Sequence, residues 1–374
     1  MKKIFGGPSR YIQGAGVLAE LAEYAKVLGT KPAIIIDPDI VDCVMDTVNK
    51  SFGEKEDAFY LEILGKNCIR ECCHETIDFF RENANAAGCD MFVGIGGGMT
   101  LDIAKAAAHY EKTPMISCPT TAATDAPCSA LSVIYNTEGV WIHHLFLDKN
   151  PDLVLVDEQV IAKAPVRYNL AGMADALSTY YEAATANAAN VDNFLGGKHT
   201  VISDTIAKLC YDIIYQYGEQ AAAAFKVRAV TPAVEKVIEA STLLSGIGFE
   251  SNQSSASHAV QNAMTALEAT HKYYHGEKVA FGIMTQLALE AWDNEEIEKF
   301  AKFCISLGLP VTLADISLGN ASEEDLMKVA ELACREGETI HNTVVPVTPK
   351  VVFDAIKTAD ELGKLYKTKY SKNF

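Results

Sequence analysis

The stretch that decides the fold is residues 90–105, DMFVGIGGGMTLDIAK, where an apolar run leads through glycines into a helical pattern. Glycines let backbone amides come close to a diphosphate, and a helix that follows directs its positive end at the same place. The turn contains four of them, Gly94, Gly96, Gly97 and Gly98. Met99 occupies the last glycine position of the strict G-x-G-x-x-G pattern. The stretch therefore predicts phosphate binding without specifying the nucleotide, and a plain tight turn is the alternative.

Strand and helix patterns alternate on both sides of this stretch. Short apolar runs typical of buried strands lie at residues 32–37, 59–64, 114–119 and 153–157. Helical patterns, as at 16–29 and 69–88, separate several of them. Strands separated by helices indicate parallel βαβ units, so we expect a Rossmann-like parallel sheet with helices on both faces. Residues 131–147 instead predict a hairpin that turns at 136–139, inserted into the α/β order.

The second half of the chain is helical in pattern. From about Pro165 onward, apolar residues recur at helical intervals and strand patterns vanish. We therefore expect an N-terminal nucleotide-binding α/β domain over residues 1–162 and an all-α domain over residues 163–374.

Composition restricts the class of protein. The 374 residues are 49% hydrophobic and 22% charged, which is typical of a soluble globular protein. The formal net charge is −17 and no run of Lys and Arg compensates for it, so we expect no nucleic-acid partner. No stretch of eighteen apolar residues occurs, so we expect no membrane span.

The ten cysteines indicate a reducing compartment. They are scattered along a chain that is too large to depend on disulfides, which favours reduced thiols and a cytoplasmic location. One group stands apart in the segment CIRECCHE, namely Cys68, Cys72, Cys73 and His74. It could hold a metal, but no second Cys pair has zinc-finger spacing, so buried thiols on a helix are the favoured interpretation.

A carboxylate follows the apolar run at residues 32–36. Asp37 could accept hydrogen bonds from a ribose and would repel a 2′-phosphate, which would favour NAD over NADP. Asp37 could equally cap a helix or start a turn before Pro38, and the sequence leaves both roles open.

Three histidines fall within residues 257–282. His271 and His275 are four residues apart, which on a helix places both imidazoles on one face and is a spacing typical of metal ligands. Two imidazoles leave a tetrahedral ion half bare, so another ligand must come from elsewhere. A carboxylate among small apolar residues is costly without a compensating cation, which nominates Asp175. Glu182 lies seven residues on and on the same helical face, and spacing does not decide between the two.

Seven segments occur in an order that resembles the glycerol dehydrogenases of the iron-containing (group III) alcohol dehydrogenase superfamily. The resemblance spans nearly the whole chain and rests on GIGGGMTLDIAKA, PTTAATDAPCSALSVIYNTEG, NPDLVLVD, AGMADAL, SGIGFES, YYHGEKVAFG and EGETIHN. It implies a dehydroquinate synthase-like architecture, in which a divalent metal lies in the cleft between the NAD-binding domain and the helical domain.

The resemblance implies one divalent metal per subunit, held by Asp175, His258 and His275. His271 then becomes a neighbour of the site and a candidate proton relay to solvent, which corrects the spacing argument. Two imidazoles and one carboxylate favour zinc, although ferrous iron accepts the same ligands.

The resemblance also implies where cofactor and substrate bind. Asp125, in the TDAP segment, matches the residue expected to hold substrate hydroxyls. The implied NAD contacts are Asp37, Gly96, Gly97, Gly98, Thr120, Thr121, Ser129, Leu131 and Tyr135. We therefore expect an oxidoreductase that transfers a hydride from the secondary hydroxyl of glycerol to NAD and forms dihydroxyacetone.

Departures from the family pattern leave the substrate open. Typical relatives carry glycine and alanine after GFES and a second histidine three residues past the first ligand, where this chain has NQSSAS and Gln261. Glycerol is the leading substrate, followed by propane-1,2-diol, other vicinal diols and larger polyols. A lyase or cyclase of the dehydroquinate synthase type is the alternative, although the catalytic segments hold few basic residues beyond Lys105 and Lys278. A binding protein without catalysis is a third possibility, against which the intact ligand set argues. The family also implies a homo-oligomer, commonly an octamer.

Overall fold

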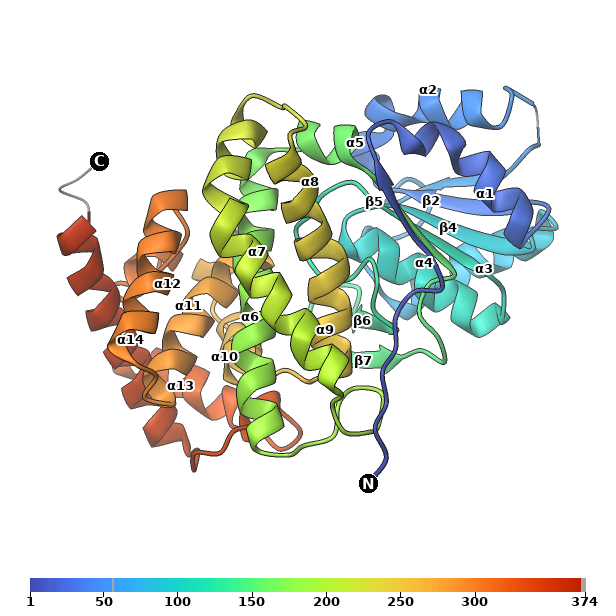
Figure 1. The fold of residues 1–374 in the computed structure, drawn as a ribbon. Coiled ribbons are helices and arrows are strands. Elements are labelled where there is room, and N and C mark those ends of the chain that lie inside the picture. Colours follow the sequence, from blue (N-terminus) through green and yellow to red (C-terminus); the bar gives the residue numbers. More distant parts are fainter. Residues whose placement is uncertain (56, 371–374) are drawn as a thin grey trace. The chain divides into compact units, whose positions relative to one another are not determined.

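The structure is a computed structural model that describes residues 1–55 and 57–370 (Figure 1). Its contacts divide the chain into two compact units, which we describe separately. The α/β unit comprises residues 6–169 and 224–247, and the helical unit comprises residues 1–5, 170–223 and the chain from Gly248 onward.

The α/β unit is built on a six-stranded parallel sheet with the strand order β1-β8-β5-β4-β2-β3. Every residue of β2, β4, β5 and β8 is buried, as expected for a sheet covered on both faces. The predicted parallel sheet is confirmed. Its strands are β1 (Tyr11–Gly14), β2 (Pro32–Ile36), β3 (Tyr60–Ile63), β4 (Met91–Gly96), β5 (Met115–Pro119) and β8 (Leu153–Asp157).

Helices cover both faces of this sheet. Successive strand residues point to opposite faces, so Ile35 and Phe92 join one core cluster with Phe80 of α3, whereas Ile34 joins a second cluster with Leu21 of α1. The helices of the unit are α1 (Leu21–Leu28), α2 (Val41–Ser51), α3 (His74–Ala86), α4 (Gly98–Glu111), α5 (Glu158–Lys163) and α8 (Pro232–Glu239).

The predicted hairpin is also present, as a separate two-stranded antiparallel sheet. Its strands are β6 (Leu131–Tyr135) and β7 (Trp141–Phe146), with a register shift at Ile134 and Tyr135. The turn is fixed by Asn136, whose side-chain oxygen accepts hydrogen bonds from the backbone amides of Glu138 (3.1 Å) and Val140 (2.8 Å).

The helical unit confirms the helical pattern of the second half. Among the described residues, no helix is both long and apolar enough to cross a membrane. The helices of the second half, apart from α8, are α6 (Val166–Ala188), α7 (Val201–Lys226), α9 (Ser245–Ser251), α10 (Ala256–Met264), α11 (His275–Leu289), α12 (Asn294–Leu307), α13 (Glu323–Ala333) and α14 (Pro349–Tyr370).

The compact units do not coincide with the two contiguous ranges 1–162 and 163–374 expected from the sequence. Residues 224–247 group with the α/β unit, where the Tyr11 hydroxyl lies 2.9 Å from Oγ1 of Thr242 and the Gln13 amide donates to the carbonyl of Glu235 at 2.8 Å. Residues 1–5 group with the helical unit, where the Asn193 amide donates to the carbonyl of Ile4 at 2.8 Å. These tertiary contacts have no counterpart in local periodicity. The two contiguous ranges remain a prediction about domains.

Candidate metal centre and nucleotide site

Three helices of the helical unit each contribute one side chain to a single cluster. Asp175 lies on α6, His258 on α10, and His275 is the first residue of α11. Nε2 of His275 lies 3.2 Å from Oδ1 of Asp175 and 3.3 Å from Nε2 of His258, and Nε2 of His258 lies 3.5 Å from the same Oδ1. These three residues form the one group among the described residues that has the geometry to hold a metal ion.

The carboxylate of Asp175 is the buried member of this cluster. Its side chain is 2% exposed, and Oδ1 has no hydrogen-bond partner within the described structure. Burial acts to raise its pKa, but the nearby imidazoles of His275 and His258 outweigh it and hold the pKa of Asp175 well below its usual value. Among the described residues, the ion pairs of this carboxylate are with the two histidines and not with a lysine or arginine.

A second buried carboxylate contacts the cluster from the next turns of α6. Glu182 accepts a hydrogen bond from Nδ1 of His258 at 2.6 Å. Its other oxygen accepts from the backbone amides of Ser255 and His258, each at 2.9 Å. Burial acts to lower the pKa of His258, but the carboxylates of Glu182 and Asp175 together raise it well above its usual value.

Two glycines allow the three helices to approach this closely. A Cβ on Gly276 would lie 2.0 Å from the carbonyl oxygen of Ala171, so α11 and α6 meet directly beside His275. A Cβ on Gly282 would lie 2.3 Å from the carbonyl oxygen of Ser257, where α11 crosses α10. Neither contact is compatible with any other residue type at the present separations.

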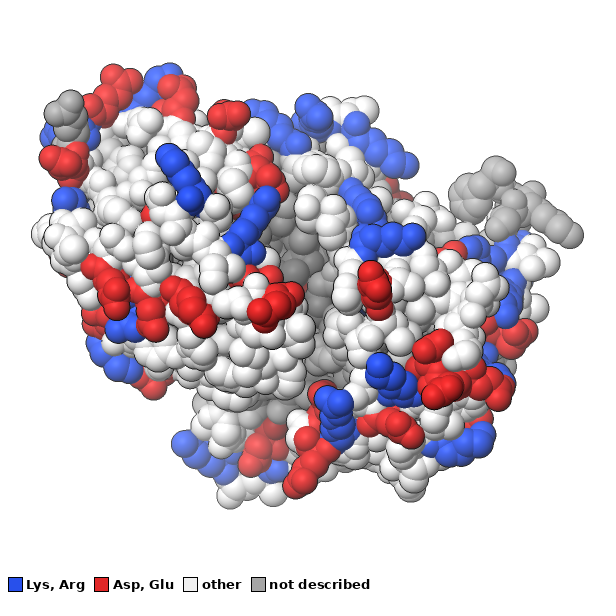
Figure 2. Space-filling view, turned by 180° about the vertical axis from the view of Figure 1, so that it is seen from behind, with Lys and Arg blue, Asp and Glu red and all other residues white. Residues whose placement is uncertain are grey.

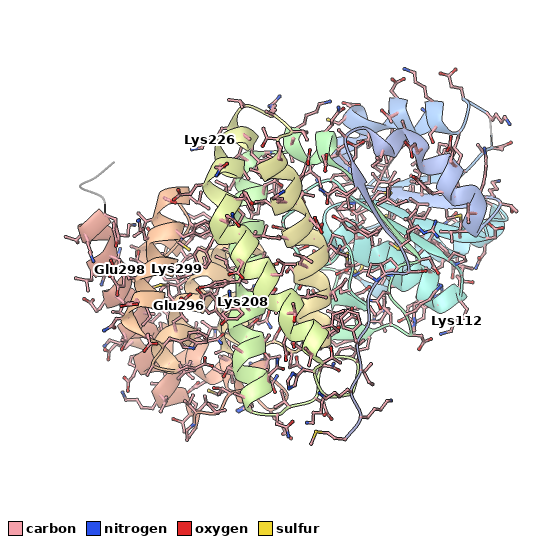
Figure 3. The ribbon with its side chains drawn as sticks, in the orientation of Figure 1. Lys112, Lys208, Lys226, Glu296, Glu298 and Lys299 are labelled. Atoms are coloured by element: carbon pink, nitrogen blue, oxygen red, sulfur yellow. The ribbon has the colours of Figure 1, made fainter. Side chains whose placement is uncertain are left out.

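Buried polar side chains also connect the three ligand-bearing helices. Oε1 of Gln286 on α11 accepts from the hydroxyl (2.6 Å) and the amide (3.1 Å) of Ser257 on α10. The amide nitrogen of Gln286 donates to the carbonyl of Tyr181 on α6 at 3.1 Å. The Tyr181 hydroxyl in turn donates to Glu296 of α12 at 2.7 Å, beside Lys299 (Figure 3).

The remaining candidates near His258 and His275 lie outside the three-residue cluster. His271 is exposed, and its Nε2 lies 2.9 Å from the carbonyl of Thr265. Because a carbonyl only accepts, this ring nitrogen carries the hydrogen. Gln261 lies one helical turn after His258 and is buried, with no hydrogen-bond partner for Oε1 in the described part of the chain.

The predicted glycine turn joins β4 to α4 in the α/β unit. Gly96 ends β4, and a Cβ there would lie 2.7 Å from the side chain of Thr100. Gly97 is the N-cap of α4, and no heavy atom lies within 4 Å of where its Cβ would be. Gly97 supplies no side-chain oxygen to cap the first amides of α4. These amides can therefore donate hydrogen bonds to an anion.

Asp37 has the capping role that the sequence left open. Its Oδ1 accepts from the backbone amide of Asp39 at 3.0 Å, at the start of a 3₁₀ turn over Pro38–Ile40. Arg70 lies 3.5 Å from Asp37 and forms a closer pair with Asp39. The capping bond uses one carboxylate oxygen and does not test the proposed contact with a ribose.

The other expected cofactor contacts follow β5 and start the hairpin. Thr120 is buried and its amide donates to the carbonyl of Gly96 at 3.0 Å, so the end of β5 lies beside the glycine turn. Thr121 is half-buried next to it. Ser129 precedes β6 and is buried. Leu131 and Tyr135 are the first and last residues of β6 and are half-buried, and burial raises the pKa of Tyr135.

A buried ion pair holds the segment from Ala126 to Leu131 in place. Lys105 on α4 lies 2.9 Å from Oδ1 of Asp102, and both are almost fully buried. The Lys105 ammonium also donates to three main-chain carbonyls, those of Ala126 (2.8 Å), Ser129 (3.3 Å) and Leu131. Oδ2 of Asp102 accepts from the Val133 amide at 3.0 Å. The pair thus fixes the backbone that carries two expected NAD contacts.

Asp125 lies in the same unit as the glycine turn. It is half-buried in the loop after β5, and its carbonyl accepts from the Cys128 amide at 3.3 Å. A Cβ on Gly246 would lie 2.9 Å from that carbonyl, so the loop packs against the segment that follows α8. Its expected contact with substrate hydroxyls stays a prediction.

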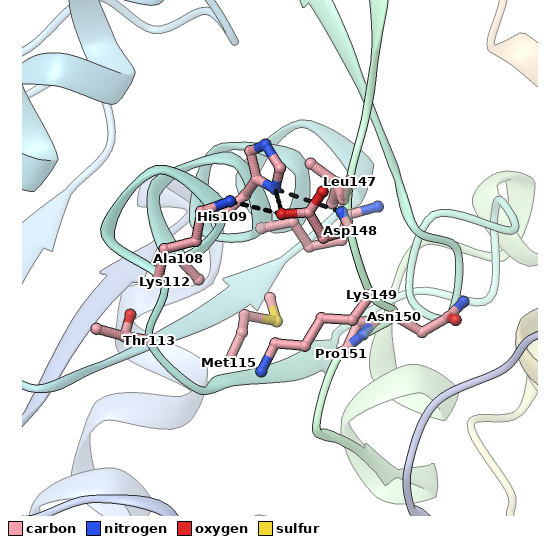
Figure 4. Close-up of a pocket in the computed structure, with 11 residues that line it drawn as sticks. Ala108, His109, Lys112, Thr113, Met115, Leu147, Asp148, Lys149, Asn150 and Pro151 are labelled. Atoms are coloured by element: carbon pink, nitrogen blue, oxygen red, sulfur yellow. Dashed lines mark hydrogen bonds and ion pairs between the residues drawn. The ribbon is translucent and has the colours of Figure 1, made fainter.

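A pocket of about 160 Å³ opens at the far end of α4 (Figure 4). Its wall includes His109, Lys112 and Asp148, and Lys112 pairs with Asp148. The glycine turn lies at the start of the fourteen-residue α4, and the pocket lies at its end. The two are therefore about 20 Å apart along the helix axis. We therefore do not assign the pocket to the cofactor.

The cysteine segment does not form a metal group among the described residues. Cys72 and Cys73 are buried and Cys68 is half-buried, and all ten cysteines are free thiols. Cys73 is the N-cap of α3 rather than a residue within it. On the face shown in Figure 2, both basic and acidic side chains reach the surface.

Sequence reasoning overlooked two residue groups. The helical face of Glu182 makes it a candidate ligand, but its contact with the distant His258 amide is visible only in three dimensions. Lys105 and Asp102 are three residues apart on a helix, and that spacing is the signal that could have identified them as a pair.

Comparison with known proteins places these observations in context. Residues 8–158 match the family described as iron-containing alcohol dehydrogenase. The chain is 45% identical to a glycerol dehydrogenase of Thermotoga maritima, over 96% of this chain and 97% of that protein. It is 44% identical to a glycerol dehydrogenase of Escherichia coli, over 98% and 99%. The crystal structure of a probable glycerol dehydrogenase from Sinorhizobium meliloti has a TM-score of 0.91 at 40% identity and covers 97% of this chain and 99% of that one.

Proposed function

The chain belongs to the iron-containing alcohol dehydrogenase family, and from that premise we propose that this oxidoreductase transfers a hydride from the secondary hydroxyl of glycerol to NAD. The product would be dihydroxyacetone. One observation of the structure supports the proposal above all others: the ligand atoms of Asp175, His258 and His275 lie 3.2 to 3.5 Å apart.

The spacing of these atoms fits a tetrahedral metal. Zinc binds nitrogen at about 2.0–2.1 Å and carboxylate oxygen at about 2.0–2.2 Å, and a tetrahedron with bonds of those lengths has edges of about 3.3–3.6 Å. The unpartnered Oδ1 of Asp175 faces both imidazoles, as a ligand would. We therefore assign one divalent metal per subunit to these three residues, with zinc ahead of iron.

The chain supplies the electrostatic setting for the reaction. A divalent metal, when bound, supplies Lewis-acid chemistry that acidifies a hydroxyl and stabilises developing negative charge. Three protein ligands leave a fourth tetrahedral position open. Asp175 balances part of the ion's charge from a buried position, which keeps that interaction unscreened by water.

Residues of the α/β unit are assigned to NAD. The uncapped start of α4 and the turn Gly96 to Gly98 would take the diphosphate, and Asp37 would accept hydrogen bonds from the ribose. Thr120 and Thr121 follow the neighbouring strand, and Ser129, Leu131 and Tyr135 complete the assigned contacts. We expect discrimination against NADP, because Asp37 would repel a 2′-phosphate.

Two further residues are assigned to substrate and proton handling. Asp125 would orient a second hydroxyl of the polyol, which gives a reason for preferring diols over simple alcohols. His271 would exchange the released proton with solvent, since its ring is exposed and Nε2 is already engaged by Thr265.

The preferred polyol depends on the neighbourhood of His258. Gln261 carries a buried oxygen without a described partner, and such an atom binds a donor at a benefit of about 1–3 kcal/mol. Glycerol remains the leading substrate, followed by propane-1,2-diol, other vicinal diols and larger polyols. We further infer a cytoplasmic homo-oligomer, with the octamer as the expected assembly.

A substrate panel tests the proposal. Zinc-loaded protein is mixed with NAD or NADP and with glycerol, propane-1,2-diol or a larger polyol, and NADH is followed by absorbance. We expect NADH from glycerol and much less NADPH. The dehydroquinate synthase alternative is disfavoured, because the relatives are named as dehydrogenases. If NAD binds but no alcohol of the panel yields NADH, the dehydrogenase proposal fails. A lyase or cyclase of the dehydroquinate synthase type then becomes the favoured function.

A further inference from the structure

The side chain of Glu182 makes three hydrogen bonds to one short segment of another helix. Oε2 lies 2.6 Å from Nδ1 of His258, and Oε1 accepts from the amides of Ser255 and His258 at 2.9 Å each. The side chain is 1% exposed, so these bonds are not shared with bulk water. We propose that Glu182 is the positioning residue of the metal centre: it fixes the orientation and the tautomer of His258 that leave Nε2 free for the metal.

The direction of the hydrogen bond decides the tautomer. A carboxylate only accepts, so Nδ1 of His258 carries the hydrogen that points at Glu182. In the neutral imidazole, Nε2 then bears the lone pair. That atom faces Oδ1 of Asp175 and Nε2 of His275, at 3.5 and 3.3 Å. Glu182 and the proposed metal position therefore lie on opposite sides of the same ring.

Glu182 also sets where helix α10 begins. The N-cap Ser255 makes no side-chain capping bond, although the first amides of a helix need acceptors. Glu182 accepts from the amide of His258, the third residue of α10, and so performs from α6 the role that a capping side chain would perform locally. One carboxylate thus holds both the backbone and the ring of His258.

These bonds distinguish Glu182 from a metal ligand. Both of its oxygens are already engaged, one by two amides and the other by Nδ1, and Glu182 is not in the group of side chains that can reach a common ion. Carboxylates that orient a ligating histidine in this way typically change metal affinity by about 10- to 100-fold when they are replaced.

Glu182→Gln is the sharpest substitution. Glutamine has the same shape, and the two amides of Ser255 and His258 require its oxygen in the place of Oε1. Its NH₂ group then faces Nδ1 of His258 and donates to it, which forces the hydrogen onto Nε2 and blocks the atom that faces the metal position. A purely structural carboxylate would give no such inversion, because the amides that fix the backbone keep their acceptor.

The inference rests on the proposed metal site, so the experiment measures metal binding in wild type first. Zinc affinity is determined for full-length wild type, Glu182→Gln and Glu290→Gln by competition with a chromogenic chelator, and cobalt-substituted samples report the coordination geometry by visible absorption. Glu290 is the matched control, since the hydrogen bonds that its carboxylate accepts in the described part of the chain come from Gln286, Trp292 and Thr343 and not from a proposed ligand.

We expect Glu182→Gln to weaken zinc binding about 10- to 100-fold and to alter the cobalt spectrum, while Glu290→Gln matches wild type. If wild type binds zinc and Glu182→Gln binds it equally well with the same spectrum, the positioning role is wrong and the metal site stands. If wild type binds no zinc, both are wrong.

Nitrogen-15 spectra of zinc-loaded, histidine-labelled wild type supply a second measurement that does not depend on the variant's folding. We expect His258 to show a protonated Nδ1 and a metal-bound Nε2. A metal-bound Nδ1, or a proton on Nε2, would overturn the inference.

Discussion

Two buried aspartates, one in each compact unit, differ in what balances their charge. Asp102 of the α/β unit lies 2.9 Å from the ammonium of Lys105 and accepts from the Val133 amide. Among the described residues, Oδ1 of Asp175 in the helical unit pairs with two imidazoles, at 3.2 and 3.5 Å, and has no hydrogen-bond partner. The first charge is neutralised by the chain itself. We propose that the second is balanced by a bound metal cation.

This difference separates a charge that stabilises the fold from a charge proposed to bind a metal. Burial raises the pKa of Asp102 and Lys105 counteracts it, so removing either partner leaves an unpaired group in the core. Removing Asp175 should instead weaken the binding of a metal cation by the cluster. The variants below therefore affect different quantities, namely metal affinity in one case and folding free energy in the other.

The largest effect is expected for Asp175→Asn. Asparagine keeps the volume but loses the charge and the anionic ligand, so zinc affinity should fall by at least about 100-fold and NADH formation should be lost. Chelator competition measures the first and absorbance the second. Full activity in this variant would refute the ligand assignment.

Lys105→Met should lower the folding stability and leave the zinc affinity unchanged. The change strands the buried charge of Asp102 and three main-chain carbonyls, which should lower the free energy of unfolding by about 3–5 kcal/mol. Denaturant titration measures it. Zinc affinity of the folded variant should equal that of wild type, and Asp102→Asn combined with Lys105→Met should recover part of the loss. An unchanged midpoint in Lys105→Met would contradict the architectural role.

Gly276→Ala should lower both the folding free energy and the zinc affinity. The new methyl group would lie 2.0 Å from the Ala171 carbonyl, so α11 must move away from α6 and carry His275 with it. We expect a loss of about 1–3 kcal/mol in folding free energy and weaker zinc binding. Gly97→Ala is the control, because no heavy atom lies within 4 Å of its Cβ position. Wild-type zinc affinity in Gly276→Ala would show that the close approach is not needed.

The smallest effect is expected for Asp315, a carboxylate nearer the surface than Asp102 and Asp175. Asp315 accepts from the amides of Val311 and Thr312 and pairs with Lys367; burial opposes these bonds, but they lower its pKa. The unfolded chain therefore binds more protons, and this stabilisation is present above the unfolded pKa of about 4 and is lost as the pH falls towards the folded value. Asp315→Asn should lower the melting temperature slightly at pH 7, by the equivalent of about 1 kcal/mol or less. The difference should shrink on acidification, and a gap that widens below pH 4 would have the wrong sign.

The sequence predicted the α/β unit well because its information is local. Each strand is an apolar run bounded by turn residues, and the glycines of residues 94–98 mark the turn between a strand and a helix. The hairpin over residues 131–147 was equally visible, since Asn136 and Gly139 are turn formers. The grouping of residues 224–247 with that unit was not predictable, because it depends on contacts such as that between Tyr11 and Thr242.

The candidate site was predictable only in part. Helical spacing nominated His271 with His275, but α11 begins at His275 and His271 precedes it, after a 3₁₀ turn, so the four-residue rule does not apply there. The structure brings His275 together with His258 and Asp175, the set implied by the family resemblance. The role of Glu182 required the position of α10 relative to α6, which no pattern within either helix encodes.

X-ray absorption at the zinc edge tests the central claim most directly. Zinc-loaded protein should show nitrogen and oxygen neighbours at about 2.0–2.1 Å, with the multiple scattering of two imidazoles and no sulfur. Sulfur neighbours at about 2.3 Å would place the metal on the cysteines and contradict the account of Asp175 as a charge that awaits a cation.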